Sequence, residues 1–263
     1  MTKRNKIIII VAAIALFVIG AGVFIGVVFF SPMSDPLYVA HRGYSKTNPD
    51  NTPLSFAAAA NKGFWGIETD IRFTKDGIPV CAHDADVKFE DGTSLVIAEN
   101  TYAALREKPL KNTKTADKVY LCPFEEYLTA CANGDKVAVI ELKTICSADE
   151  LVLLLTKVDA LHSRAKSAFI AFDYENLTAL RMADESLALQ YLSETKNDPR
   201  FEDCLKDGIS IDVKYNVATK ALVKKFHKNG LKVNVWTINT DWRRGEMRRL
   251  GVDFITSDVY YKN

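Results

Sequence analysis

Short apolar runs alternate with helix-length amphipathic segments along most of the chain. Eight runs have the length of a buried strand: LYVA (37–40), WGIETDI (65–71), KVAVIEL (136–142), SAFIAF (167–172), LALQYL (187–192), GISIDV (208–213), LKVNVW (231–236) and VDFIT (252–256). Helix-length segments lie between most of them, at residues 54–62, 148–161, 176–184, 218–229 and 242–250. This alternation predicts an α/β protein built as a (β/α)8 TIM barrel. An open doubly wound sheet is the alternative, but no GxGxxG follows the first run.

One region interrupts the alternation after the second predicted strand. Thr74-Lys75-Asp76-Gly77 is a turn sequence, and IPVCAHD (78–84) follows it directly. This order predicts a hairpin that returns toward the end of the second strand. Residues 85–120 are polar, and we expect an irregular insertion on the loop side of the barrel. Its apolar side chains either cover the barrel mouth or pack down on the barrel.

The N-terminal segment has the character of a membrane anchor. Residues 7–30 are 24 positions without a charge or a proline. As a helix they would span about 36 Å, whereas the hydrocarbon core of a bilayer is roughly 30 Å thick. Lys3, Arg4 and Lys6 precede the segment and no basic residue follows until Arg42, so the positive-inside rule predicts a cytoplasmic N-terminus and an extracytoplasmic remainder. A cleaved signal peptide is the alternative, although its apolar region is typically only about 7–15 residues long.

These features predict three parts. Residues 1–30 are a cytoplasmic tip and a single transmembrane helix, residues 31–36 are a linker with two prolines, and residues 37–263 are the barrel. Beyond residue 30 the chain has 31 basic and 33 acidic residues, and this balance excludes the basic surface of a nucleic-acid-binding protein. Its five cysteines are odd in number and irregularly spaced, so they predict neither a disulfide framework nor a zinc site.

Charged and histidine side chains occur where the first predicted strands end. They are His41, Arg42, Glu68, Asp70, His83, Glu141 and Lys143. Because catalytic residues of such barrels lie at the C-terminal ends of the strands, we expect these side chains to meet. The alternatives without a catalytic function are structural histidines, a solvated strand face for Glu68 and Asp70, and a simple ion pair between Glu141 and Lys143. The apolar neighbours of the carboxylates argue for buried strands, where unpaired charge is costly.

The chemistry of these residue types points to a phosphate and a metal ion. The i, i+2 spacing places Glu68 and Asp70 on one face of their strand. With Glu141 they offer the oxygen ligands that Mg²⁺ and Ca²⁺ prefer. Histidines suit proton transfer near neutral pH, and arginine and lysine suit phosphate binding.

The order of motifs resembles the glycerophosphodiester phosphodiesterase family. The resemblance rests first on AHRGYSKTNPDNTPLSFAAAANKGFWGIETDIRFTKDGIPVCAHD (40–84), which has the family's HRG, a PENT-like turn, an amphipathic helix, E-x-D, TKDG-x-PV and HD. Three later stretches also resemble family strands, namely VIELK (139–143), VNVWTIN (233–239) and ITSD (255–258). One departure is Asp50, which stands where the family has Glu before Asn51-Thr52, and we leave this shortened acid outside the catalytic set.

The resemblance implies hydrolysis of a glycerophosphodiester to glycerol 3-phosphate and an alcohol. It implies a cofactor, Mg²⁺ or Ca²⁺, and roles for individual residues. The implied roles are metal ligation by Glu68, Asp70 and Glu141, acid/base catalysis by His41 and His83, phosphate binding by Arg42 and Lys143 with Arg42 also stabilising the transition state, and contact with the substrate glycerol by Trp236. Lysophospholipids or a polyglycerol-phosphate wall polymer are alternative substrates, and a non-catalytic barrel that binds a phosphorylated ligand is the alternative of another class.

Overall fold

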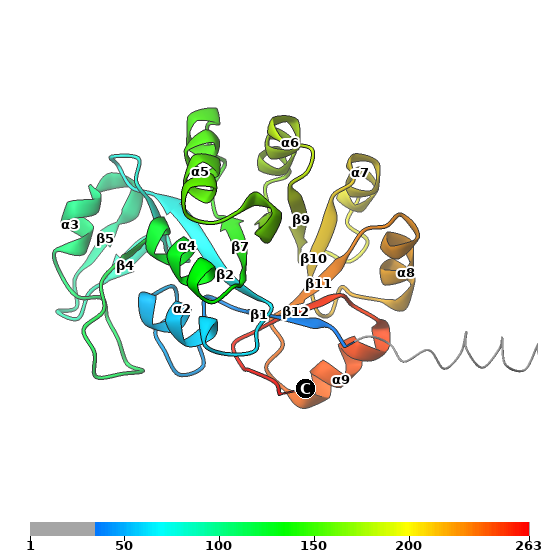
Figure 1. Cartoon of the computed structure of the whole chain (residues 1–263), viewed down its shortest axis with the longest axis horizontal. Coiled ribbons are helices and arrows are strands. Elements are labelled where there is room, and N and C mark those ends of the chain that lie inside the picture. The colour runs from blue at the N-terminus through cyan, green and yellow to red at the C-terminus, as the bar shows by residue number, and fades with distance from the viewer. Residues whose placement is uncertain (1–34, 263) are drawn as a thin grey trace, which may run out of the picture. The chain divides into compact units, whose positions relative to one another are not determined.

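Eight parallel strands form a closed ring in the computed structural model, which describes residues 35–262 (Figure 1). They are β1 (Leu37–Ala40), β2 (Gly66–Phe73), β7 (Val137–Leu142), β8 (Ser167–Ala171), β9 (Ala188–Ser193), β10 (Ser210–Lys214), β11 (Val233–Trp236) and β12 (Phe254–Ser257). Each strand pairs with its neighbours in this order, and β12 pairs with β1 to close the ring. The predicted barrel is therefore confirmed, and the open sheet is excluded.

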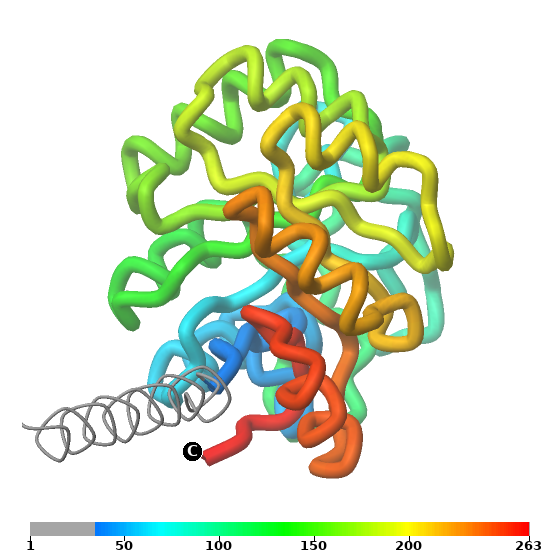
Figure 2. Tube along the Cα trace, turned by 90° about the vertical axis from the view of Figure 1, so that its right-hand side faces the viewer, coloured from blue at the N-terminus to red at the C-terminus, as the bar shows by residue number. Residues whose placement is uncertain are grey.

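Within the described residues, seven helices lie outside the ring and each precedes the next barrel strand (Figures 1 and 2). They are α2 (Pro53–Ala60), α4 (Phe124–Asn133), α5 (Ala148–Leu161), α6 (Tyr174–Ala183), α7 (Arg200–Asp207), α8 (Lys220–Lys228) and α9 (Asp241–Leu250). Local sequence sets several of their ends: Ser147 and Glu150 form a capping box at the start of α5, and Gly251 ends α9 in the left-handed conformation. Helices α4 and α7 were not predicted from the sequence.

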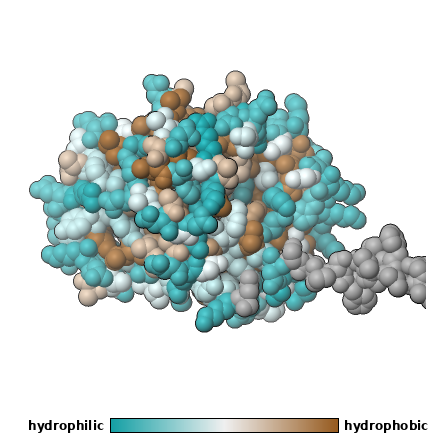
Figure 3. Space-filling view, viewed as in Figure 1, coloured by the Kyte–Doolittle hydropathy of each residue, from teal (hydrophilic) through white to brown (hydrophobic). Residues whose placement is uncertain are grey.

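The predicted transmembrane segment, residues 7–30, lies outside the described residues. In the part that the structure does describe, none of the helices combines the length and the apolar character that crossing a bilayer requires. The outer surface in Figure 3 is mainly hydrophilic, with hydrophobic residues scattered among polar ones. Such scatter is normal for a protein surface.

The alternation of side chains along each strand fills two layers. Outward-facing residues such as Ile140 and Val213 pack beneath the helices in the main core. Inward-facing residues, among them Val39, Val139 and Ile170, form a separate cluster with Leu192 and Phe254. Because side chains repeat every second residue, the strand that places Val139 inside the ring also directs Glu141 inward, one step closer to the C-terminal mouth.

The predicted hairpin is present, and the segment after it is more ordered than expected. The end of β2 continues past the ring and pairs with antiparallel β3 (Pro79–Cys81), which in turn pairs with β6 (Cys122–Pro123). Between them lie β4 (Asp86–Lys88), β5 (Ser94–Val96), a 3₁₀ turn at Ile97–Glu99 and α3 (Tyr102–Arg106). These elements enclose a small core of their own, formed by Val80, Ala82, Val87, Phe89, Ile97, Leu105 and Leu121. The prediction of an irregular insertion was wrong, because the segment forms two short strands, a 3₁₀ turn and a helix. Its apolar residues pack mainly in this small core.

Candidate active site

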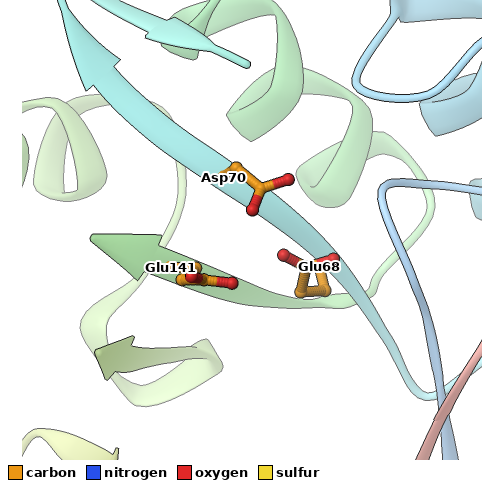
Figure 4. Close-up of side chains that lie close together, drawn as sticks. All are labelled: Glu68, Asp70 and Glu141. Atoms are coloured by element: carbon orange, nitrogen blue, oxygen red, sulfur yellow. The ribbon is translucent and has the colours of Figure 1, made fainter. Parts of the chain in front are cut away.

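Three buried carboxylates converge at the C-terminal side of the ring. Glu68 and Asp70 lie on β2, and Glu141 lies on β7 directly beside Asp70. One oxygen from each lies within 4.8 Å of the others, and Figure 4 shows the three side chains facing a common space between the two strands. The structure therefore brings together the three residues that the sequence singled out as ligands, and it buries them instead of exposing a solvated face.

The electrostatics of this group fit a cation. Burial, followed by the charges of Asp70 and Glu141, raises the pKa of Glu68 well above its usual range. Burial and the charge of Asp70 raise the pKa of Glu141 to about 7. Burial also opposes ionisation of Asp70, but the charges of Arg42 and Lys143 outweigh it and lower the pKa. Glu68 Oε1 and Asp70 Oδ1 are buried without a hydrogen-bond partner, so a divalent cation would coordinate oxygens that accept no hydrogen bond from the protein.

Two basic side chains border the carboxylates. Arg42 Nε lies 3.3 Å from Asp70 Oδ2. Lys143 Nζ donates to Glu141 Oε1 at 2.7 Å and lies 3.4 Å from Asp70 Oδ1. The ion pair between Glu141 and Lys143, one of the alternatives that the sequence left open, is thus present. Lys143 nevertheless belongs to the site, since both basic side chains line the cavity described below.

The His-Arg-Gly triplet turns the chain tightly against β2. Arg42 and Gly43 both have positive φ, at 55° and 79°. The backbone N–H of Arg42 donates to Glu68 Oε2 at 2.8 Å, and that of Gly43 donates to the Glu68 carbonyl at 3.2 Å. A Cβ on Gly43 would lie 2.6 Å from the backbone carbonyl carbon of Ser55, so only glycine fits.

Gly43→Ala is expected to lower the free energy of unfolding by about 3 kcal/mol, since it combines left-handed strain with a backbone clash. Gly77→Ala is the matched control, because Gly77 has a φ of 74° but no atom within 4 Å of its added Cβ, and it should cost only about 1 kcal/mol. Urea unfolding of both variants measures the difference. Equal losses would mean that the close approach to Ser55 is not important.

The two histidines are each held by an aspartate. His41 Nδ1 lies 2.7 Å from Asp258 Oδ1, and His83 Nδ1 lies 2.9 Å from Asp84 Oδ1. Burial alone would raise the pKa of Asp258, but its hydrogen bond to His41 and the charge of that histidine lower it to about 2. Asp258 is therefore an acceptor for the Nδ1 proton, which leaves Nε2 of His41 for chemistry.

Asp258 lies in the ITSD stretch, and the sequence alone did not predict a role for its carboxylate. The side chains of Ser45 and Asn239 also donate to it, at 3.0 and 2.6 Å. The contact with His41 joins residues 217 positions apart, and only the pairing of β1 with β12 brings them together.

Asn51 is a second residue that sequence reasoning missed. Its side-chain amide donates to Asp70 Oδ2 at 2.7 Å.

Asp258→Asn is expected to lower turnover by about tenfold or more, because the neutral amide no longer fixes the tautomer of His41. Since the pKa of Asp258 in the folded state is about 2, below its ordinary value of 3.8, the carboxylate stabilises the fold above about pH 4, and that contribution disappears as the pH falls toward 2. Urea midpoints across this range should therefore fall further for the wild type than for the variant. Parallel pH profiles with unchanged turnover would contradict the orienting role.

A cavity of about 150 Å³ unites these groups. It is lined by His41, Arg42, Glu68, His83, Glu141, Lys143, Ile170, Phe172, Leu192, Glu194, Asp212, Trp236 and Thr256. Phe172 and Trp236 meet edge to face with ring centroids 6.0 Å apart, which gives the cavity one aromatic wall. Asp50 is not among the lining residues, although its carboxylate lies 3.7 Å from Arg42 Nη1. A larger groove of about 650 Å³ between α2 and α4 is lined by no histidine, lysine or arginine.

A closed parallel barrel with titratable side chains gathered at its C-terminal mouth is the arrangement found in the barrel enzymes. Comparison with known proteins makes this specific. The model of the glycerophosphoryl diester phosphodiesterase family matches residues 41–261. The chain belongs to this family and is a phosphodiester hydrolase of it.

Individual relatives agree with this assignment. Glycerophosphodiester phosphodiesterase 1 of Bos taurus is 26% identical over 261 residues, covering 84% of this chain and 77% of the relative. A glycerophosphodiester phosphodiesterase of Bacillus altitudinis is 23% identical, covering 83% of this chain and 93% of the relative. A phosphodiesterase of Oleispira antarctica, solved in complex with the product sn-glycerol-3-phosphate, shares the fold with a TM-score of 0.77 at 21% identity, over 85% of this chain and 93% of that one.

Proposed function

We propose that the protein hydrolyses glycerophosphodiesters to glycerol 3-phosphate and an alcohol in the cavity at the barrel mouth. The observation that carries this proposal is that three buried carboxylates, two histidines and two basic side chains line or border a single cavity. The Oleispira antarctica relative, whose solved structure contains sn-glycerol-3-phosphate, supports the same class of substrate.

The proposed roles follow from the chemistry of each group. Glu68, Asp70 and Glu141 would hold a divalent cation, Mg²⁺ or Ca²⁺, which supplies Lewis-acid stabilisation of phosphoryl oxygens when bound. Arg42 and Lys143 attract the phosphate into the cavity, and Arg42 shares the negative charge that develops in the transition state. One of the two histidines removes a proton from the nucleophile, and the other protonates the departing alkoxide.

Phosphorus NMR with a panel of substrates tests the proposal. Glycerophosphocholine, a lysophospholipid and a polyglycerol-phosphate polymer are compared, and we expect glycerophosphocholine to give the resonance of glycerol 3-phosphate at the highest rate. A cyclic phosphate resonance that rises and then decays would identify the C2 hydroxyl as nucleophile, whereas its absence throughout favours water. Failure to cleave any of the three substrates would contradict the proposed function.

The location of the reaction is also part of this proposal. The 24 uncharged residues at 7–30 and the basic residues before them support a single-pass protein of the cell membrane with its catalytic domain outside the cytoplasm. Protease added to intact spheroplasts should then digest the catalytic domain. Protection until the membrane is permeabilised would place the domain on the cytoplasmic side and refute this part of the proposal.

A further inference from the structure

A further buried carboxylic acid, outside the proposed metal site, is among the residues that line the cavity. Asp212 lies on β10 and is only 1% exposed. Its Oδ2 accepts a hydrogen bond of 3.0 Å from the side-chain amide of Asn234, whereas its Oδ1 is buried with no hydrogen-bond partner. Asp212 lines the same cavity as Glu68, Glu141 and Trp236. An unpaired carboxyl oxygen is costly to bury. A ligand in the adjoining cavity could supply the missing hydrogen-bond partner.

The surrounding side chains hold Asp212 in place without satisfying that oxygen. The amide nitrogen of Asn234 also donates to Thr256 Oγ1 at 3.0 Å, and its oxygen accepts from the backbone N–H of Val235 at 2.8 Å. Asn234 is therefore fixed by neighbours on β11 and β12 and supports one side of the carboxyl group. Burial and then the charge of Glu141 raise the pKa of Asp212 well above its usual range, and a neutral carboxyl group both donates and accepts hydrogen bonds.

The order of strands in the ring places Asp212 across the barrel from Glu68 and Asp70. Starting from β2, which carries Glu68 and Asp70, β10 is the fourth strand in either direction around the eight-stranded ring. A molecule whose phosphate lies near Arg42 would extend from that wall toward β10. A cavity of about 150 Å³ has the volume that holds a ligand of the size of benzene, and a three-carbon glycerol unit is no larger.

We propose that Asp212 determines specificity for the glycerol unit, its free Oδ1 forming a hydrogen bond with the hydroxyl farthest from the phosphate. This inference rests on the proposed function, since it takes a glycerophosphate as the ligand. It assigns to Asp212 recognition of one of the two hydroxyls that distinguish glycerol 3-phosphate from a simple alkyl phosphate. A site built to pair with a hydroxyl discriminates strongly against an analogue that lacks it, because the polar group of the protein is then left unpaired.

Calorimetric binding of two ligands that differ only in that hydroxyl tests the inference. The ligands are 3-hydroxypropyl phosphate and propyl phosphate, with sn-glycerol 3-phosphate as reference, all measured in the presence of Mg²⁺. For the wild type, the ratio of the two dissociation constants should favour the hydroxylated ligand by about tenfold or more. For Asp212→Ala the ratio should fall to about one, and Asp212→Leu, which fills more of the lost volume, replaces it if the alanine variant does not fold.

Gln190→Leu is the matched control. Gln190 is also buried inside the ring and also has an unpartnered side-chain oxygen, but it lines a separate hollow near the first residues of the strands. Its variant should keep the wild-type ratio. A wild-type ratio near one, a ratio retained without Asp212, or an equal loss in Gln190→Leu would each overturn the inference while leaving the proposed function standing. Absence of sn-glycerol 3-phosphate binding to the wild type would instead reject the proposed function, and the role of Asp212 with it.

Discussion

Replacing either His41 or His83 with alanine is expected to lower the turnover of a glycerophosphodiester by about 10²- to 10⁴-fold, the usual contribution of a positioned acid or base. Both histidines line the cavity that Glu68 and Glu141 also line, and each has one ring nitrogen engaged by an aspartate, which orients the ring. Since one residue removes a proton and the other supplies one, each single variant should be severely impaired. Release of glycerol 3-phosphate measures both.

His227→Ala is the control for these variants. Its ring also pairs with an aspartate, at 2.7 Å from Asp253 Oδ2, but it lies on α8 and does not line the cavity. Loss of an exposed histidine–aspartate pair should leave turnover near the wild-type value. If His41→Ala or His83→Ala also keeps near wild-type turnover, the scheme of paired acid and base is wrong.

Removal of divalent cations is expected to abolish activity, and Mg²⁺ or Ca²⁺ should restore it. Without a cation, Glu68 and Glu141 have raised pKa values, and that of Glu141 is about 7. Between about pH 4.5 and pH 7 the folded state then binds more protons than the unfolded state, so the free energy of unfolding falls as the pH rises. Glu141 alone accounts for a loss of roughly 3 kcal/mol across this window.

A bound cation should remove that pH dependence, because it stabilises the ionised carboxylates and adds binding energy to the folded state. Glu141→Gln provides the matched variant, since it removes one of the two groups with a raised pKa and should make the cation-free pH profile shallower than that of the wild type. Unfolding by urea at several pH values, with and without chelator, measures these effects. Activity that survives thorough chelation, or a wild-type profile that is flat without cations, would contradict a cation site at these carboxylates.

The strands of the barrel were predictable because each one carries its signal locally. Runs such as KVAVIEL and GISIDV are short, mainly apolar and flanked by helix-length segments. The pairing of Asp70 with Glu141 follows once β2 and β7 are neighbours. The carboxylates, histidines and basic residues were visible for the same reason, since each interrupts or ends such a run. The i, i+2 spacing of Glu68 and Asp70, and of Glu141 and Lys143, predicts that each pair shares one side of its strand.

The residues that were missed depend on contacts between distant parts of the chain. Asp258 became significant only when the closing of the ring brought it to His41. Asp212 lay unnoticed inside the run GISIDV, where a single acid among apolar residues was the available signal. The insertion was judged irregular because its strands are only three residues long, too short to show a period, although Phe89 and Leu105 pack in a core of their own.

In the proposed mechanism, the cation and the phosphate bind side by side in the barrel mouth. Mn²⁺ can stand in for Mg²⁺ among oxygen ligands, and its unpaired electrons broaden the phosphorus resonance of any phosphate that binds beside it. We predict strong broadening of sn-glycerol 3-phosphate by the Mn²⁺-loaded wild type, and its loss in Glu68→Gln and Glu141→Gln. A phosphorus signal that stays sharp while Mn²⁺ and ligand are both bound would show that the two sites are separate and would contradict the account.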